Sequence, residues 1–208
     1  MERIKTLSLL SGILGFVVVA LGAWTRLADA GLGCPDWPGC YGFVTIPVSP
    51  EEIDIANSKF PDTPYEVAKA IPEVVHRYFA AALGFFIVCI AYLSVKSKDV
   101  PTNIRNLSVF LLAWVIMQGT FGYWTVSLKL WPQVVTTHLM SGFLTTTLLW
   151  LLYFKTKDLI ESRASWNFES TTKRLFSVSI ILVAIPVSYT HLRAHETRGN
   201  LVCRLLLE

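Results

Sequence analysis

The sequence predicts an all-α, polytopic membrane protein, with a four-helix transmembrane bundle followed by an incomplete fifth span. Of its 208 residues, 53% are hydrophobic and only 16% are charged, and the mean hydropathy is +0.50. Soluble domains of this size are less apolar. Four runs contain no Asp, Glu, Lys or Arg, at 6–25, 78–95, 106–128 and 130–154. Each run approaches or exceeds the ~20 residues that a helix needs to cross ~30 Å of hydrocarbon.

These runs predict four membrane helices, at about 6–26, 72–97, 104–129 and 132–156. Pro72 suits the first turn of the second helix, where its missing N–H costs nothing. We therefore expect residues 1–156 to form one bundle, with a long loop at 26–71. Within that loop, 51–57 and 65–70 are candidates for short surface helices.

The placement of lysine and arginine predicts the orientation of the bundle. One side of the spans holds Arg3, Lys5, Lys96, Lys98, Arg105, Lys155, Lys157, Arg163, Lys173 and Arg174. The other side holds only Arg26, Lys59, Lys69 and Lys129, with Arg77 at its edge. Because basic loops stay in the cytoplasm, the N-terminus is predicted inside and the loop 26–71 outside. The net charge is only +3, and we expect no nucleic-acid partner.

Three ionisable side chains, Glu73, His76 and Arg77, lie at the start of the second predicted span. In a helix their spacing of three and four residues puts all three on one face. Ionisable groups in a membrane helix are costly and usually face protein or a water-filled cavity. This stretch alone is compatible with a functional site and, equally, with an interfacial ion pair and a snorkelling arginine.

A second histidine, His138, lies about six residues inside the outer end of the fourth span, or about 9 Å at 1.5 Å per residue. His76 lies about four residues inside the outer end of its own span, and the two helices run in the same direction. The two imidazoles thus resemble the ligand pair that a haem iron accepts from both faces. Iron, zinc and a simple hydrogen-bonded pair all fit this spacing, but the apolar bundle, with no further thiolate or carboxylate ligand inside it, favours haem.

The outer loop contains two cysteines in the sequence Cys34-Pro-Asp-Trp-Pro-Gly-Cys40. On an oxidising face such a pair predicts a disulfide rather than two free thiols. A structural staple is the favoured interpretation, and a redox-active pair is the alternative. The motif is not C-x-x-C-H, which leaves covalent haem attachment unsupported, and the loop has no histidine to complete a zinc site.

Five motifs in order carry a family resemblance. They are Trp24-Thr25-Arg26-Leu27 before Gly31-Leu32, the pair Cys34 and Cys40, Glu73-x-x-His76-Arg77, Gln118-Gly119-x-x-Gly122-x-x-Thr125-Val126, and Trp131-Pro132-x-Val134-x-x-x-His138-Leu139. From about residue 7 to 154, this order and spacing resembles the bacterial heme A synthase family, in particular members with a cysteine pair in the first outer loop. Ala28-Asp29-Ala30 departs from the pattern, since the family more often has a threonine- and serine-bearing turn there.

The resemblance implies an eight-span protein of two similar four-helix bundles in the bacterial inner membrane. The first bundle would take heme O as its substrate, and the second would hold a heme b cofactor. The implied reaction oxidises a ring methyl of heme O to the formyl group of heme A for a terminal oxidase. His76 and His138 would be the axial ligands, Glu73 the catalytic carboxylate, and Arg26 and Arg77 contacts to the haem propionates. Membrane lipid, a heme O synthase and an electron donor are the expected partners.

The end of the chain does not follow this pattern. Residues 157–187 are expected to form a cytoplasmic loop and a truncated fifth span, because the apolar run 175–187 covers only about 20 Å as a helix. Residues 188–208 resemble translated sequencing-library adapter and are expected to be non-native, so His191, His195 and Cys203 receive no function. The second bundle is expected to be missing, and the chain alone to be inactive.

Two other classes of protein share these features. A small b-type membrane cytochrome that relays electrons would also place two histidines in a four-helix bundle. A non-catalytic haem-handling protein of oxidase assembly would do the same. Glu73 is expected to separate these from the enzyme, because an electron carrier needs no carboxylate one turn from an axial ligand.

Overall fold

The computed structural model describes residues 1–161 and contains five helices in that range. Four are long and apolar enough to cross a membrane, namely α1 (Glu2–Leu27), α3 (Val67–Lys96), α4 (Thr102–Ser127) and α5 (Pro132–Glu161). The fifth, α2 (Pro50–Lys59), lies in the long loop between α1 and α3. The predicted all-α, polytopic membrane class is confirmed. The predicted fifth span and tail lie outside the described residues.

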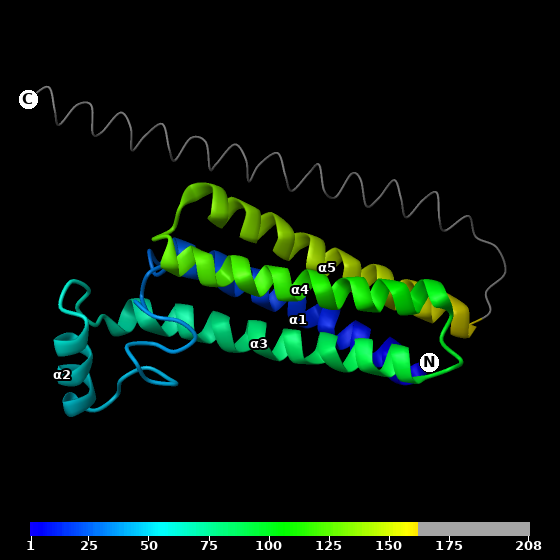
Figure 1. The fold of residues 1–208 in the computed structure, drawn as a ribbon, viewed down its shortest axis with the longest axis horizontal. Helices are drawn as coiled ribbons and strands as arrows, with labels where there is room; N and C mark the ends of the chain where they lie inside the picture. The colour runs from blue at the N-terminus through cyan, green and yellow to red at the C-terminus, as the bar shows by residue number, and fades with distance from the viewer. Residues whose placement is uncertain (162–208) are drawn as a thin grey trace, which may run out of the picture. The chain divides into compact units, whose positions relative to one another are not determined.

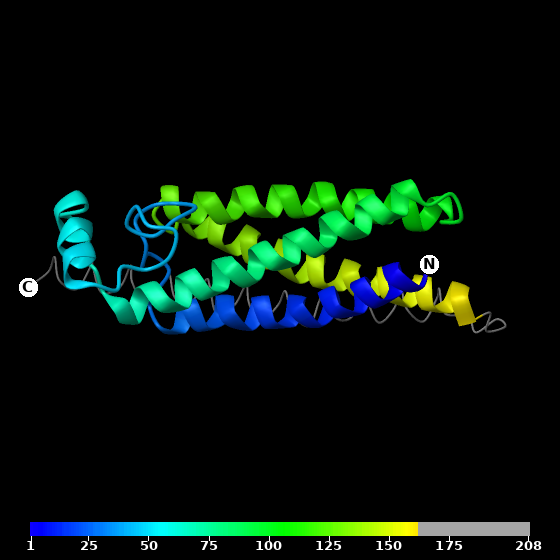
Figure 2. The same ribbon diagram turned by 90° about the horizontal axis from the view of Figure 1, so that it is seen from below.

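The four long helices form a ring. α1 packs against α3 and α5, and α4 packs against the same two helices. Within the described residues α3 and α5 make no such contact with each other, so they occupy opposite corners of the ring. α3 and α5 both begin at the end of the bundle where α2 and its flanking loops lie, whereas the N-terminus lies at the other end (Figures 1 and 2).

Two predicted boundaries are wrong by five residues. α3 begins at Val67 rather than at 72, so Pro72 lies inside the helix. The turn before Pro72 is closed by the N–H groups of Lys69 and Ala70, which donate to Glu66 at 3.0 and 2.9 Å. Proline removes only its own N–H donor, and the expected surface helix at 65–70 is therefore the first turn of α3. α5 continues to Glu161 rather than stopping at 156.

The half of the bundle near the N-terminus contains the main apolar cluster. Its buried members are Ile4, Leu83, Ile87, Ile90, Val100, Ile104, Leu111, Leu148, Leu149 and Leu152. Small residues let α1 approach α5 closely, since a Cβ atom added at Gly12 would lie 3.1 Å from the Trp150 indole and one at Gly15 would lie 2.9 Å from Thr146 Oγ1. Close packing of small residues is a main source of helix association in lipid.

Residues 28–66 lie at the end of the bundle away from the N-terminus, here called the outer end (Figure 1). This segment, here called the outer cap, has a small core of its own. Cys34, Cys40, Tyr41 and Ala56 are buried there, together with Ala70 of α3. The Tyr41 hydroxyl donates to the Pro64 carbonyl at 3.2 Å. The predicted helix at 51–57 is confirmed as α2, which begins with a capping box formed by Ser49 and Glu52. The cap is therefore a folded structure anchored to α3.

The packing of Gly15 predicts a stability effect. Gly15→Val should lower the free energy of unfolding by about 1–3 kcal/mol, because the added side chain overpacks the α1–α5 contact at Thr146. Gly84→Ala is the matched control, since a Cβ atom there meets nothing within 4 Å. Thermal unfolding in detergent measures both. A Gly15→Val protein that melts with the wild type would contradict the packing described.

Candidate functional site

The ring of His76 is held by α1. Its Nδ1 atom lies 3.1 Å from the carbonyl oxygen of Val18. Because a carbonyl only accepts hydrogen bonds, Nδ1 must carry the proton, and the lone pair is then on Nε2. Metal-binding histidines commonly have this arrangement, with one nitrogen bonded to a backbone carbonyl and the other facing the metal.

His138 is held through its backbone by α4. Gln118 Nε2 donates to the His138 carbonyl oxygen at 2.8 Å, and the Ser141 hydroxyl donates to Gln118 Oε1. The Nδ1 atom of His138 is buried and has no hydrogen-bond partner among the described residues. A buried polar atom without a partner is costly. The imidazole therefore retains binding capacity that the described chain does not use.

Each imidazole packs against a glycine on a neighbouring helix. A Cβ atom at Gly22 of α1 would lie 3.1 Å from His76 Cε1, and one at Gly122 of α4 would lie 3.3 Å from His138 Cε1. Both are tighter than ordinary contacts. Gly22 and Gly122 thus make room for the two rings in the same way.

The number of metal-binding side chains near the histidines distinguishes a haem from a zinc ion. Within residues 1–161, no group of three or more His, Cys, Asp or Glu side chains could hold a metal ion. Protein zinc sites use three or four such ligands. A haem supplies the equatorial nitrogens of its own iron and needs only axial ligands from the protein. His76 and His138 therefore fit a haem better than a bare metal ion.

Glu73 and Arg77 form a buried ion pair below the outer cap. The Glu73 side chain is 6% exposed and that of Arg77 is 15% exposed, with 2.5 Å between Oε1 and Nη2. The second carboxylate oxygen, Oε2, accepts the backbone N–H of Cys34 at 2.9 Å. Arg77 Nη1 also donates to the carbonyl oxygens of Asp36 and Gly39, at 2.9 and 2.5 Å. The guanidinium expected to meet propionates is thus engaged by the cap.

Cys34 and Cys40 form the predicted disulfide, with their Cα atoms 4.8 Å apart. Both residues are 0% exposed. Thiol exchange requires access to a sulfur atom, so this burial favours the structural staple over a redox-active pair. The loop between them folds over the bundle, where the Trp37 ring contacts Tyr123 of α4 edge-on at 5.7 Å.

Arg26 is not part of this cluster. It is exposed in the last turn of α1, and no ion pair or side-chain hydrogen bond joins it to Glu73, His76, Arg77 or His138.

Two residues that hold the structure around the site, Asp36 and Thr25, were not predicted from the sequence. The carboxylate of Asp36 accepts the N–H groups of Tyr41 and Gly42 at 2.6 and 2.7 Å, and Thr25 donates to the Pro72 carbonyl at 3.2 Å. An Asp shortly before a Tyr-Gly turn is a signal for the first contact, because aspartate often binds nearby backbone N–H groups. Nothing in the sequence indicates the second.

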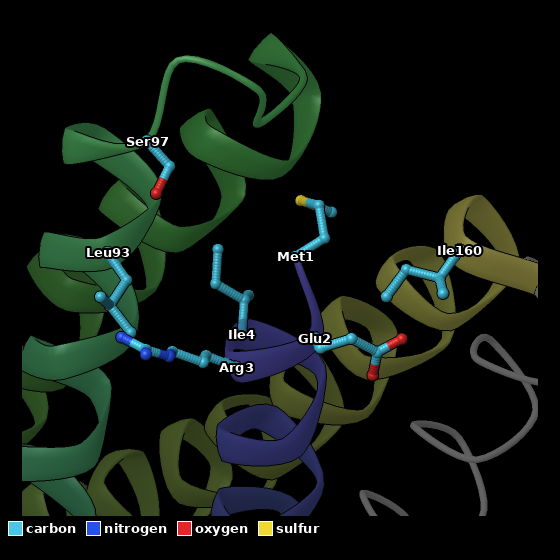
Figure 3. Close-up of a pocket in the computed structure, with 7 residues that line it drawn as sticks. All are labelled: Met1, Glu2, Arg3, Ile4, Leu93, Ser97 and Ile160. Carbon is cyan, nitrogen blue, oxygen red and sulfur yellow. The ribbon is translucent and has the colours of Figure 1, made fainter.

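A hollow of about 460 Å³ lies at the opposite end of the bundle, between the N-terminus, the end of α3 and the end of α5 (Figure 3). It is lined by Met1, Glu2, Arg3, Ile4, Leu93, Ser97 and Ile160. None of the predicted site residues lines it. The candidate site is therefore at the outer end, defined by side-chain chemistry rather than by this hollow.

Comparisons with known proteins agree with the motifs. The chain is 47% identical to a heme A synthase of Shewanella oneidensis over 141 residues, covering 68% of this chain and 42% of that protein. It is 28% identical over 190 residues to a heme A synthase of Nitrosospira multiformis, covering 82% and 52%. The chain thus spans about half the length of these relatives. No solved structure matches.

A protein family described as cytochrome oxidase assembly protein, COX15-CtaA, matches residues 5–190. Apart from the first three residues of α1, that range contains the four membrane helices of the described residues, together with the disulfide loop, His76 and His138. The chain therefore belongs to the COX15-CtaA family of cytochrome oxidase assembly proteins.

Proposed function

We propose that this chain is the substrate-binding bundle of a heme A synthase, an oxidoreductase that converts a methyl group of heme O into the formyl group of heme A. The proposal is supported by the relatives of that name, which are 47% and 28% identical. The observation that carries it is a fixed imidazole one turn from a buried carboxylate. His76, with its Nδ1 bonded to Val18, lies one turn from Glu73 on α3.

His76 and His138 would be the axial ligands of heme O. Their helices occupy opposite corners of the ring and both begin at the outer end. A flat macrocycle between α3 and α5 would meet one imidazole on each face. The Val18 carbonyl would orient His76, and Gln118 would fix the turn that carries His138. Gly22 and Gly122 would leave space for the two rings.

Glu73 would act on the reacting methyl group. A bound haem would supply the redox chemistry. Oxidation of the methyl carbon would pass its electrons to an external oxidant, release protons and build positive charge on that carbon. A carboxylate beside that carbon can accept a proton or stabilise the charge. Glu73 is held by hydrogen bonds at both oxygens, so little reorganisation would be needed during the reaction.

The two alternative classes are less well supported. Glu73 also anchors the disulfide loop through Cys34, and an electron-carrying cytochrome could use a carboxylate for that purpose. The carboxylate alone therefore does not separate the classes. The similarity to proteins named heme A synthase favours the enzyme over both the cytochrome and a non-catalytic haem-handling protein.

We further propose that the protein lies in a bacterial inner membrane with its N-terminus in the cytoplasm. The heme b cofactor would belong to a second bundle, in the part of the relatives that this chain does not span. A heme O synthase and an electron donor would be its partners. The basic residues Lys96 and Lys98 at the inner turn support this orientation.

Reporter fusions test the orientation. A fluorescent protein fused after Lys98 should fold and fluoresce in the cytoplasm, whereas alkaline phosphatase fused after Lys129 should be active outside, because the two turns lie at opposite ends of α4. The reciprocal fusions should be silent. The opposite pattern would place the disulfide loop in the cytoplasm and refute the proposed topology.

The catalytic role of Glu73 predicts a specific block. In the full-length protein, Glu73→Gln should keep its haem but slow formation of heme A about 10²–10⁴-fold, because the group acts in the reaction more than in binding. Chromatography of extracted haems should show heme O or a partly oxidised form. His76→Ala should instead lower the amount of bound haem.

Glu66→Gln is the matched control, since Glu66 forms an exposed ion pair with Lys69 near the same helix start. It should leave the haem profile unchanged. Normal heme A in Glu73→Gln membranes would show that the carboxylate serves only to anchor the loop.

A further inference from the structure

We propose that the Cys34–Cys40 loop is a positioning element for the Glu73 carboxylate, and that Arg77 and Asp36 are the positioning residues that join the two. The inference rests on the proposed function of Glu73 in oxidising heme O. It gives the disulfide a task beyond stabilising the outer cap. Oxidation of the substrate, rather than haem binding, would then depend on the loop.

The carboxylate itself is the first step of the argument. Glu73 is 4% exposed, and its two oxygens face different partners. Oε2 accepts the N–H of Cys34, which is one end of the disulfide, and Oε1 pairs with Arg77. Two bonds from different directions fix both the position and the rotation of a carboxylate, whereas a single bond leaves rotation free.

Arg77 provides the second connection to the loop. While Nη2 pairs with Glu73, Nη1 donates to the carbonyl oxygens of Asp36 and Gly39. One planar guanidinium thus spans the helix and the loop, which a lysine ammonium at the end of a flexible chain cannot reproduce. The loop holds Arg77 through backbone atoms and so fixes the second donor to Glu73.

Two independent contacts shape the loop so that its carbonyls converge on Arg77. The disulfide joins its ends, and the Asp36 carboxylate accepts the N–H groups of Tyr41 and Gly42. These two residues have positive φ angles of 56° and 84°, and their successive N–H groups point to the same carboxylate. Asp36 therefore holds the turn after Cys40 in place by its side chain and binds Arg77 by its backbone.

A second ion pair nearby supplies a matched control. Lys69 and Glu66 lie 2.9 Å apart at the start of the same helix, with side chains 37% and 57% exposed. Neither side chain bonds to the disulfide loop. Lys69→Gln therefore removes a positive charge near the start of the same helix but leaves the bonds between Arg77 and the disulfide loop intact.

The first test needs no haem. In the purified protein, a water-soluble phosphine should reduce the buried disulfide slowly, and the freed thiols can be counted by alkylation and mass spectrometry. Arg77→Lys and Asp36→Asn should each speed reduction about tenfold or more, because losing hydrogen bonds to a charged group makes local opening of the loop easier. Lys69→Gln should reduce at the wild-type rate. Unchanged rates in Arg77→Lys and Asp36→Asn would overturn the proposal.

The second test asks whether Arg77 acts through Glu73. In the full-length protein, Arg77→Lys should retain its haem and lower the ratio of heme A to heme O about 10-fold or more. In the Glu73→Gln background the same change should add nothing, since residues that act as a unit are non-additive. Additive losses, or loss of haem together with activity, would reduce Arg77 to a structural residue and contradict the proposal.

The two tests also separate this inference from the proposed function. If Glu73→Gln makes normal heme A, the proposed catalytic role fails, and the reduction rates still report whether the loop is joined to Glu73. If Glu73→Gln is blocked but Arg77→Lys and Asp36→Asn make normal heme A, the catalytic role stands and the positioning inference fails.

Discussion

The outer half of this protein depends on one buried carboxylate. Glu73 joins helix α3 to the disulfide loop through the N–H of Cys34 and, by way of Arg77, through the loop carbonyls. Removing one partner of a buried charge pair is costly, because the other charge is left without compensation. Glu73 and Arg77 therefore depend on each other. Their bonds also fix the outer cap against the start of α3, next to His76.

The membrane imposes the second constraint, which is that polar groups among apolar helices need partners. Most hydroxyls in the bundle bond to their own helix one turn earlier, as Thr145 does to Ser141 and Thr156 to Leu152. The histidines are different because each is fixed by another helix, through Val18 or Gln118. Intramembrane ionisable groups held in this way mark functional sites more often than surface ones do.

The sequence predicted the four spans well because their signal is local, namely a long run of apolar residues that only a helix can carry across a bilayer. It predicted the disulfide because the cysteines are close in sequence. The predicted start of α3 was wrong because the helix begins one turn before Pro72, where the Glu66 carbonyl accepts the first hydrogen bonds. The sequence also did not indicate that Arg77 binds the backbone carbonyls of Asp36 and Gly39, about forty residues away. Backbone acceptors of this kind leave no residue-type signal.

In the proposed function, His76 and His138 bind one haem between α3 and α5. Electron paramagnetic resonance of the ferric, haem-loaded protein tests it most directly, because two imidazole ligands give a low-spin iron and one gives a high-spin iron. We expect a low-spin spectrum from this bundle that becomes high-spin in His138→Ala at equal haem content. A low-spin spectrum that survives His138→Ala would contradict it.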